Sequence, residues 1–238
     1  MYQKIIKELD EFKNPKQAKN LQRFFKTGKG EYGEGDIFLG LKMPQIRGVV
    51  KNYFVEASLD DAQKLLNSKI HEYRMTGVLI LVKKYKTLGE DTKGSEEIFN
   101  LYFKNTRNIN NWDLVDLSAP NIVGKYLLNN RTRHGAFLHE LAQSKNLWER
   151  RIAVLATFAF ICEKKFIDII KIAKNLLQDE HDLIHKAVGW MLREMGKKDE
   201  KGLIKFLDQY TCAMPRTMLR YSIEKLPEKK RKYYLEKK

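Results

Sequence analysis

Trp112 and Asp116 are the two residues of this chain whose types and spacing best fit a catalytic role. They lie four positions apart in the stretch NNWDLVD (110–116), at the start of an apolar segment with helical periodicity. On a helix, residues with this spacing share one face. A carboxylate beside an indole can support chemistry on a cation.

The rest of the chain is strongly basic. Its 238 residues include 45 Lys and Arg against 30 Asp and Glu, which gives a formal net charge of +15. This excess indicates a polyanionic partner, with nucleic acid as the first candidate and an anionic membrane surface as the second. A basic surface that serves only solubility is the remaining interpretation of the composition.

Apolar residues recur at helical spacing along the chain, and no segment has the pattern of a strand. Short helices are predicted over 2–12 and after Pro15, followed by a glycine-rich loop over 27–40. Further helices are predicted to begin near Met43, Ser58, His71, Glu96, Trp112, Thr132, Trp148, Phe166, Asp182, Asp199, Pro215 and Pro227.

Comparable helix starts return at intervals of roughly thirty to forty residues, a spacing typical of paired-helix repeats. The prediction is an all-α fold, a HEAT-like helical-repeat solenoid with a concave basic face. An ordinary globular all-helical domain is the alternative. Because no linker or change in composition divides the chain, residues 1–238 are predicted to form a single domain.

The sequence argues against several other classes of protein. No apolar run approaches the ~20 residues that cross a bilayer, and the amino-terminal residues lack the features of a signal peptide. Cys162 and Cys212 are predicted to be free thiols in a reducing cytoplasm. No GxSxG elbow is present, and neither cysteine has a recognisable catalytic context.

Two motifs resemble ligand sites but lack the necessary context. Residues 28–33 (GKGEYG) match GxGxxG, but a helix precedes them, and the acidic Glu31, Glu34 and Asp36 would repel a pyrophosphate. Residues 181–185 (HDLIH) resemble a zinc-binding helix motif, but His181 is predicted to precede the helix, and no third ligand follows. We therefore expect no cofactor and no metal.

Two later helices combine tryptophan with arginine. The stretch WERR (148–151) precedes an apolar face, so Arg150 or Arg151 is predicted to point away from the core, where an arginine can hold phosphate. Trp190 and Arg193 lie one turn apart on a later helix. Each tryptophan taken alone fits a core position better, but together they indicate a shared surface.

The chain resembles the AlkD family of DNA alkylation-repair glycosylases over nearly its whole length. The most specific motifs are NWDLVD (111–116), RIAV (151–154) and KAVGWMLRE (186–194), with weaker support from FFKT (24–27) and the glycine-rich loop. The resemblance implies a HEAT-like solenoid that excises cationic alkylated bases, notably N3- and N7-methylated purines, without flipping them into a pocket. Its implied partner is double-stranded DNA containing alkylated bases.

The resemblance also implies roles for particular residues. Trp112 and Trp190 resemble the indole walls of the family's catalytic cleft, and Asp116 resembles its essential carboxylate. Arg151 and Arg193 resemble its phosphate contacts. Where the family often has an aromatic residue with a hydroxyl group, this chain has Phe24 and Phe25, and the sequence does not decide which of them contacts DNA. If Phe24 is the equivalent, as we expect, it cannot donate a hydrogen bond to phosphate.

The resulting hypothesis is a monofunctional, monomeric, cytoplasmic alkylpurine DNA glycosylase that contacts no membrane. The alternative is a non-catalytic HEAT-like scaffold that binds nucleic acid or protein, because repeat proteins of this kind often serve as scaffolds. The combination of Trp112 with Asp116 favours the enzyme, since a plain scaffold does not require it.

Overall fold

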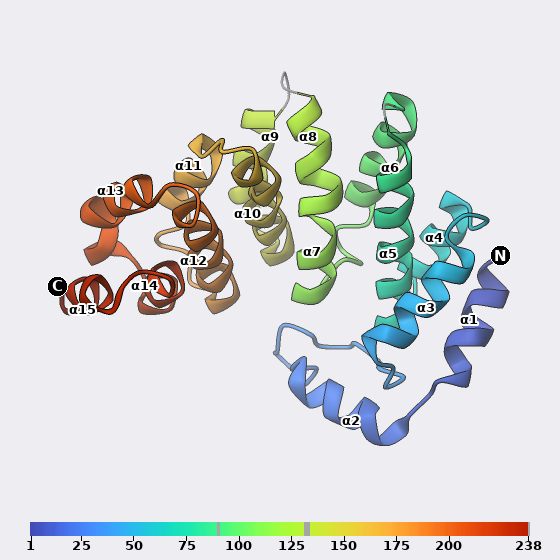
Figure 1. The fold of residues 1–238 in the computed structure, drawn as a ribbon. Helices are drawn as coiled ribbons and strands as arrows, with labels where there is room; N and C mark the ends of the chain where they lie inside the picture. The colour runs from blue at the N-terminus through green and yellow to red at the C-terminus, as the bar shows by residue number, and fades with distance from the viewer. Residues whose placement is uncertain (90, 131–133, 238) are drawn as a thin grey trace. The chain divides into compact units, whose positions relative to one another are not determined.

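The structure is a computed structural model that describes residues 1–89, 91–130 and 134–237 (Figure 1). Within these ranges the chain is helical and forms no strand, apart from an isolated bridge between Ile37 and Ile70. The predicted all-α class is therefore confirmed. The chain divides into two compact units, Met1–Ile122 and Val123–Lys238, which are described separately. The single domain over 1–238, the solenoid and its concave basic face stay predictions.

The first unit is organised around α5, which packs against α3, α4, α6 and α7. All side chains from His71 to Val82 in α5 are buried. Because residues on all faces of α5 are removed from solvent, the helix must be surrounded by other elements, and it therefore lies at the centre of the unit. The helices of this unit are α1 (Tyr2–Glu11), α2 (Pro15–Phe24), α3 (Met43–Tyr53), α4 (Leu59–Leu66), α5 (His71–Thr87), α6 (Thr92–Lys104) and α7 (Trp112–Ser118).

The predicted helix starts have clear local causes. Ser58 and Asp61 form a capping box at the start of α4, in which each side chain accepts a backbone N–H of the other. Pro15 occupies the first turn of α2, where its missing N–H costs nothing. His181 is the N-cap of α12 and accepts the N–H of Leu183. The prediction that His181 precedes its helix is thus confirmed.

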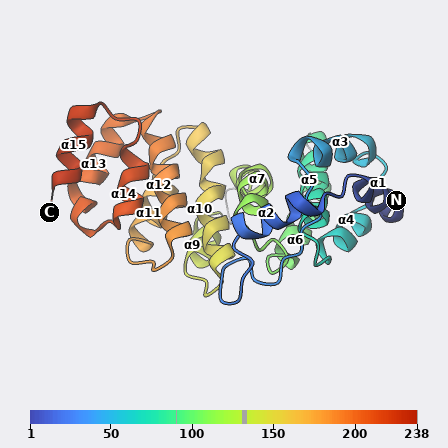
Figure 2. The same ribbon diagram turned by 90° about the horizontal axis from the view of Figure 1, so that it is seen from below.

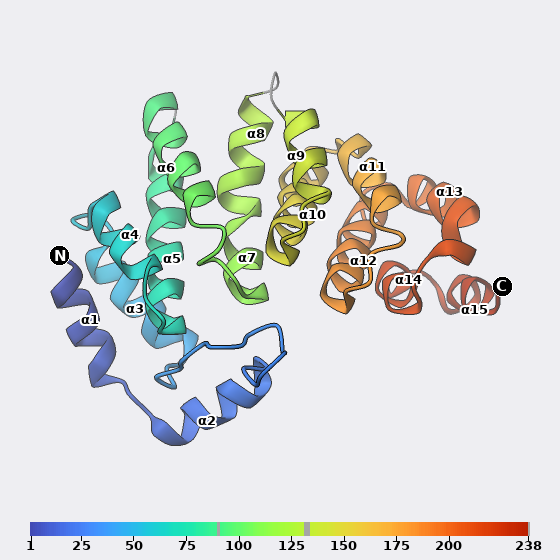
Figure 3. The same ribbon diagram turned by 180° about the vertical axis from the view of Figure 1, so that it is seen from behind.

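The second unit consists of helices in two layers. α12 packs against both α10 and α14, while α9 packs against α11 (Figure 3). Close packing of helices as paired layers buries the apolar face of each. The helices are α8 (Lys125–Asn129), α9 (His134–Ala142), α10 (Leu147–Cys162), α11 (Ile167–Asn175), α12 (Asp182–Gly196), α13 (Glu200–Tyr210), α14 (Arg216–Ile223) and α15 (Glu228–Glu236).

The stretch after α7 differs from the sequence prediction. A π-helical turn over Pro120–Gly124 follows α7 and leads into α8, and neither element was predicted. Pro120 has no backbone N–H, which disturbs the regular ladder at this point. The start predicted near Thr132 lies outside the described residues, and α9 begins at His134.

Two further expectations concern the environment of the protein. No helix in the described parts of the chain has the length and apolar character to cross a bilayer. Cys162 and Cys212 are not joined by a disulfide, and both are exposed.

Candidate functional site

Trp112 and Asp116 lie one turn apart on α7, and both side chains are half-buried. The helix begins at Trp112 because the side-chain oxygen of Asn111 accepts the Trp112 N–H at 2.9 Å. Leu114 and Val115 are buried and fix the opposite face of the helix in the core. This arrangement leaves the indole and the carboxylate on the side of α7 that is accessible to solvent.

The Trp112 indole belongs to an aromatic cluster with the end of α2. It stacks on Phe25 with ring centroids 5.2 Å apart and planes 17° apart. Phe24 and Trp112 are arranged edge to face, with ring centroids 6.0 Å apart. Phe25 is 7% exposed, whereas Phe24 is 63% exposed. Of the two phenylalanines, Phe24 is therefore the one that a large partner could contact.

Asp116 lies near a buried phenol. Burial raises the pKa of Tyr102 and outweighs the hydrogen bond with Ser118, which lowers it, while the negative charge of Asp116 makes a smaller contribution that also raises it. The Tyr102 hydroxyl and Ser118 Oγ are 2.9 Å apart at the end of α7. Tyr102 thus stays neutral and holds the helix that presents Asp116.

α2, drawn as a blue ribbon in Figure 2, is a basic helix whose last residue, Phe24, belongs to this cluster. It buries none of its residues and has no acidic residue in its first turn. The segment from residue 13 to residue 29 contains no Asp or Glu, and its positive potential is offset at its start, where Lys13 pairs with Asp10 at 3.1 Å. Its exposed basic side chains are Lys13, Lys16, Lys19, Arg23, Lys26 and Lys29.

The glycine-rich loop holds α2 in place at both ends. A Cβ on Gly33 would lie 2.4 Å from the carbonyl oxygen of Phe25, and one on Gly40 would lie 2.1 Å from that of Asn14. Only glycine permits such close approach of two backbones. Asn14 also donates its N–H to Leu39 O at 2.9 Å.

The same loop cannot bind a phosphate in the manner of a dinucleotide site. The N–H of Gly28 donates to Glu31 and the N–H of Gly30 donates to Glu34, each at 2.8 Å. These internal carboxylates occupy the donors that a pyrophosphate would need. The prediction that Asp36 would act as a third repelling acid is wrong, because Asp36 is buried and forms an ion pair with Arg74 at 2.6 Å.

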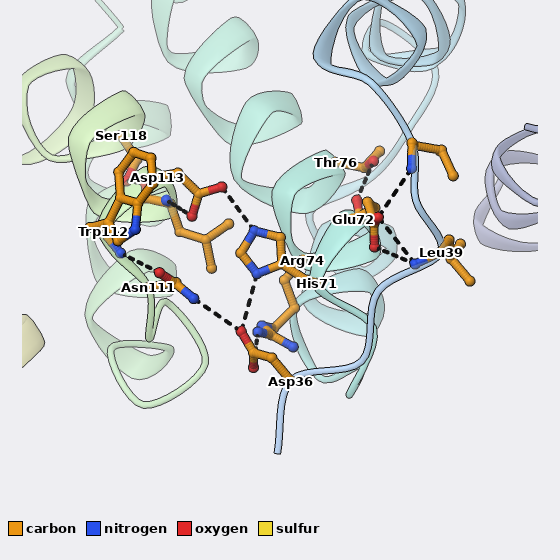
Figure 4. A network of polar contacts seen from close by, with 12 residues as sticks. Asp36, Leu39, His71, Glu72, Arg74, Thr76, Asn111, Trp112, Asp113 and Ser118 are labelled. Carbon is orange, nitrogen blue, oxygen red and sulfur yellow. Dashed lines mark hydrogen bonds and ion pairs between the residues drawn. The ribbon is translucent and has the colours of Figure 1, made fainter. Parts of the chain in front are cut away.

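A buried polar network connects this loop to α5 and α7 (Figure 4). His71 Nδ1 lies 3.2 Å from Asp36, and Nε2 lies 2.9 Å from Asp113. Asp113 accepts the Leu114 N–H at the start of α7 at 2.9 Å, and it also bonds to His71, 42 positions earlier.

In the second unit, Trp190 and Arg193 lie one turn apart on α12 as predicted. Trp190 is half-buried and donates its indole N–H to Glu194 at 3.2 Å. The Arg193 side chain is 17% exposed and forms ion pairs with Glu224 and Glu194. Arg193 lowers the pKa of Glu224, although Lys225 has the larger effect.

Arg150 and Arg151 both bond to protein partners, but Arg151 is buried and Arg150 is half-buried, so Arg150 is the one that lies outside the core. Arg150 binds Asp179 at 2.7 Å and donates to the carbonyl of Ser144 at 3.0 Å. Arg151 is 4% exposed and donates to the carbonyl of Leu183 at the start of α12. The acceptors of Arg150 lie in the connections before α10 and α12, and the Leu183 carbonyl that accepts from Arg151 lies in the first turn of α12.

Both histidines of the motif at 181–185 form hydrogen bonds with the backbone at or just before the start of α12. Besides the His181 cap, His185 Nε2 contacts the carbonyl of Asp179. Among residues 1–89, 91–130 and 134–237, no group of three or more His, Cys, Asp or Glu side chains has an arrangement that could hold a metal ion.

Comparison with known proteins identifies the family. A family model described as DNA alkylation repair enzyme matches residues 5–226. The chain belongs to this family. The chain is similar to the solved structure of a predicted DNA alkylation repair enzyme from Enterococcus faecalis, with 16% sequence identity and a TM-score of 0.68. The superposition covers 91% of this chain and 97% of the Enterococcus faecalis chain. The comparison with curated proteins found no match.

Membership of the DNA alkylation repair enzyme family gives the chain a role in alkylation repair, with DNA as its partner. The matched range includes the first and last candidate residues, Phe24 and Arg193, and all those between them. The likeness to the Enterococcus faecalis structure supports the fold. Phe24, Trp112 and Asp116 belong to the first unit, and Arg151, Trp190 and Arg193 belong to the second.

Proposed function

We propose that this DNA alkylation repair enzyme is a monofunctional glycosylase. Its substrates are cationic alkylated purines of the N3-methyladenine and N7-methylguanine type in duplex DNA, and it acts on them without base flipping. The observation that supports this is the position of Asp116 one turn from Trp112 on α7, beside the exposed Phe24 at the end of the basic helix α2.

The chemistry requires little beyond a well-placed negative charge. When the bond between C1′ and the purine nitrogen breaks, its electron pair goes to the cationic base, which leaves as a neutral molecule without being protonated. The deoxyribose becomes oxocarbenium-like, and the Asp116 carboxylate stabilises that positive charge. Water then adds to C1′ and passes a proton to the carboxylate or to solvent. Trp112 lines the sugar and excludes bulk water, which strengthens the electrostatic effect.

The second unit contributes Trp190, Arg151 and Arg193 to binding of the same duplex in this proposal. Arg193 is the more accessible cation, and a phosphate would replace Glu224 as its partner. Arg193→Gln is therefore expected to weaken DNA binding with little loss of stability. Arg151→Gln is expected to lower the free energy of unfolding as well, because it removes a buried guanidinium from the Leu183 carbonyl.

The test is release of free base from methylated duplex DNA by wild type, Asp116→Asn and a matched control, Asp60→Asn. Asp60 is a 70% exposed carboxylate of the same unit that pairs with Lys64, so its loss is expected to leave the rate unchanged. Asp116→Asn should lower the single-turnover rate by about 10²-fold or more while the Kd for DNA changes little. Full activity of Asp116→Asn would remove this residue from the mechanism.

The same assay decides between the enzyme and the non-catalytic scaffold. A scaffold binds DNA in a salt-sensitive manner but releases no base above the rate of a protein-free sample. Binding without release by wild-type protein would therefore overturn the glycosylase proposal and favour the scaffold.

A further inference from the structure

His71, the first residue of α5, is a buried imidazole held between two carboxylates (Figure 4). Its side chain is 3% exposed, with Asp36 at 3.2 Å from Nδ1 and Asp113 at 2.9 Å from Nε2. An ionised carboxylate can only accept hydrogen bonds. A neutral imidazole has one N–H and would direct a lone pair at one of the two acids. The geometry therefore requires a proton on both ring nitrogens.

The charges around the ring agree with this requirement. The groups that face it are Asp36 from the loop, Asp113 from α7 and Arg74 from α5, and the aromatic rings against it bear no charge. Burial lowers the pKa of His71, but Asp113 and Asp36 outweigh burial and the opposing charge of Arg74 and raise it to about 9. Two carboxylates, one imidazolium and one guanidinium form a neutral cluster.

Two routes lead from this imidazolium to Trp112. The first is Asp113, the residue that follows Trp112 on α7. The second is a series of ring contacts: His71 stacks on Phe38 with centroids 4.5 Å apart, Phe38 stacks on Phe25 at 5.0 Å, and Phe25 stacks on Trp112 at 5.2 Å. His71 thus contacts Asp113, which follows Trp112 in sequence. It also joins the stacked rings of Phe38 and Phe25, and the Trp112 indole stacks on Phe25.

The first turn of α7 depends on such contacts, because the first N–H groups of a helix have no partner within the helix. Asn111 accepts the N–H of Trp112 and Asp113 accepts that of Leu114. At its start Asn111 donates to Asp36 at 3.3 Å, which joins α7 to the same cluster. A change in the cluster therefore reaches both Trp112 and Asp116.

We propose that His71 in its protonated form is a positioning residue, which holds Trp112, and through α7 also Asp116, in the orientation that base release requires. This inference rests on the proposed glycosylase function. Loss of the proton leaves one carboxylate opposite a lone pair, and the resulting repulsion loosens the start of α7.

The activity test compares single-turnover base release by wild type, Asp113→Asn and His71→Gln between about pH 7 and pH 10, each rate corrected for release without enzyme. As the pH rises, the wild-type rate should fall with the pH dependence of a single proton loss, a falling limb of the pH profile whose midpoint lies at about pH 9. In Asp113→Asn this fall in rate should disappear. The Asn amide can donate to the Nε2 lone pair of a neutral His71, and Asp36 still accepts the N–H on Nδ1 of the same ring. At pH 7 this variant should keep a rate within about threefold of wild type.

His71→Gln can donate to only one of the two acids and cannot join the ring stack, so its rate should be low at every pH without the limb. A matched control is His139→Gln, whose ring lies in the second unit near Asn175 and which should keep the wild-type profile. A wild-type rate that stays level through pH 10, or the same limb in Asp113→Asn, would overturn the proposal.

A second measurement does not depend on catalysis. In protein labelled with 5-fluorotryptophan, the ¹⁹F resonance of Trp112, assigned with Trp112→Phe, should shift with a midpoint at about 9 in wild type and stay constant in Asp113→Asn. If wild type releases no base but this shift is present, the glycosylase proposal fails and the link from His71 to Trp112 stands. A Trp112 resonance that does not titrate overturns the link itself.

Discussion

The indole of Trp112 lies nearly parallel to the ring of Phe25, with planes 17° apart and centroids 5.2 Å apart. Offset stacking of this kind contributes about 0.5–1.5 kcal/mol beyond the burial of apolar area. Phe25 in turn stacks on Phe38, so the proposed wall of the catalytic site is the outermost ring of a packed column that begins in the core.

Phe24 and Phe25 should behave oppositely when replaced by alanine, although they are neighbours. Phe25→Ala removes a buried ring and should lower the free energy of unfolding by about 3–5 kcal/mol. Phe24→Ala removes a ring that is 63% exposed, and should cost less than about 1 kcal/mol while it weakens DNA binding several-fold. Urea unfolding and a DNA titration of both variants check this. A stable Phe25→Ala protein, or unchanged DNA affinity in Phe24→Ala, would contradict the assignment.

Gly189 sets the closest approach of α12 to α14. A Cβ at this position would lie 2.5 Å from the carbonyl oxygen of Met218 and 2.5 Å from the Cβ of Tyr221. Gly189→Ala is therefore expected to destabilise the protein by about 1–3 kcal/mol, since two helices must separate. Gly48, inside α3, has open space at its Cβ position, and Gly48→Ala should stabilise by up to about 1 kcal/mol through helix propensity. Thermal unfolding of the two variants should give shifts of Tm of opposite sign.

Asp61 makes part of the free energy of unfolding depend on pH in the acidic range. Its carboxylate accepts the N–H of Tyr2 at 2.8 Å and both the N–H and hydroxyl of Ser58 at 2.8 Å. Burial alone raises the pKa of Asp61, but these hydrogen bonds lower it well below its ordinary value. A lowered folded pKa means that the stabilisation is complete above the unfolded pKa and is lost as the pH falls.

Asp61→Asn should accordingly lower the free energy of unfolding by about 1–3 kcal/mol at pH 7. The difference from wild type should shrink between about pH 5 and pH 2. Urea unfolding across this range measures it, with Asp60→Asn as the control because Asp60 is exposed and in the same helical turn. A difference that stays constant down to pH 2 would show that the carboxylate's charge is not the cause.

The sequence predicted those helices whose signals are local. Ser58, Pro15 and His181 mark helix starts through hydrogen bonds or geometry within one turn, and these starts were correct. The π-helical turn before α8 was missed because apolar periodicity continues through Pro120–Gly124. There the backbone is decided by packing: a Cβ on Gly124 would lie 2.3 Å from the carbonyl of Ala156, a contact that no local pattern shows.

The candidate site was predictable in part for the same reason. The spacing of Trp112 and Asp116 is visible in the sequence, whereas the contact of Asp113 with His71 spans 42 positions. Asp36 in a polar, glycine-rich loop gives no sign of being buried, yet it pairs with Arg74 38 positions later. Partners this distant in sequence are chosen by tertiary packing, so the motif could indicate the reacting residues but not what holds them.

α2 offers the clearest test of electrostatic DNA binding, because its basic residues are exposed and have no acid among them. Each phosphate contact releases counterions, so removing one contact should reduce the slope of log K against log salt by about 1. Lys19→Gln and Arg23→Gln are each expected to weaken binding to duplex DNA of any sequence and, combined, to reduce the slope by about 2. Neither should change the free energy of unfolding by more than about 0.5 kcal/mol.

The matched control for these two variants is Lys64→Gln, which makes the same change in net charge at a lysine paired with Asp60 on α4. If binding depended only on the overall charge of +15, the control would weaken binding as much as each α2 variant. A reduced slope in the α2 variants alone would instead show that phosphates lie along this helix, beside the exposed Phe24 and the proposed site at Trp112. Titrations at several salt concentrations with unmodified duplex separate this contribution from recognition of the lesion.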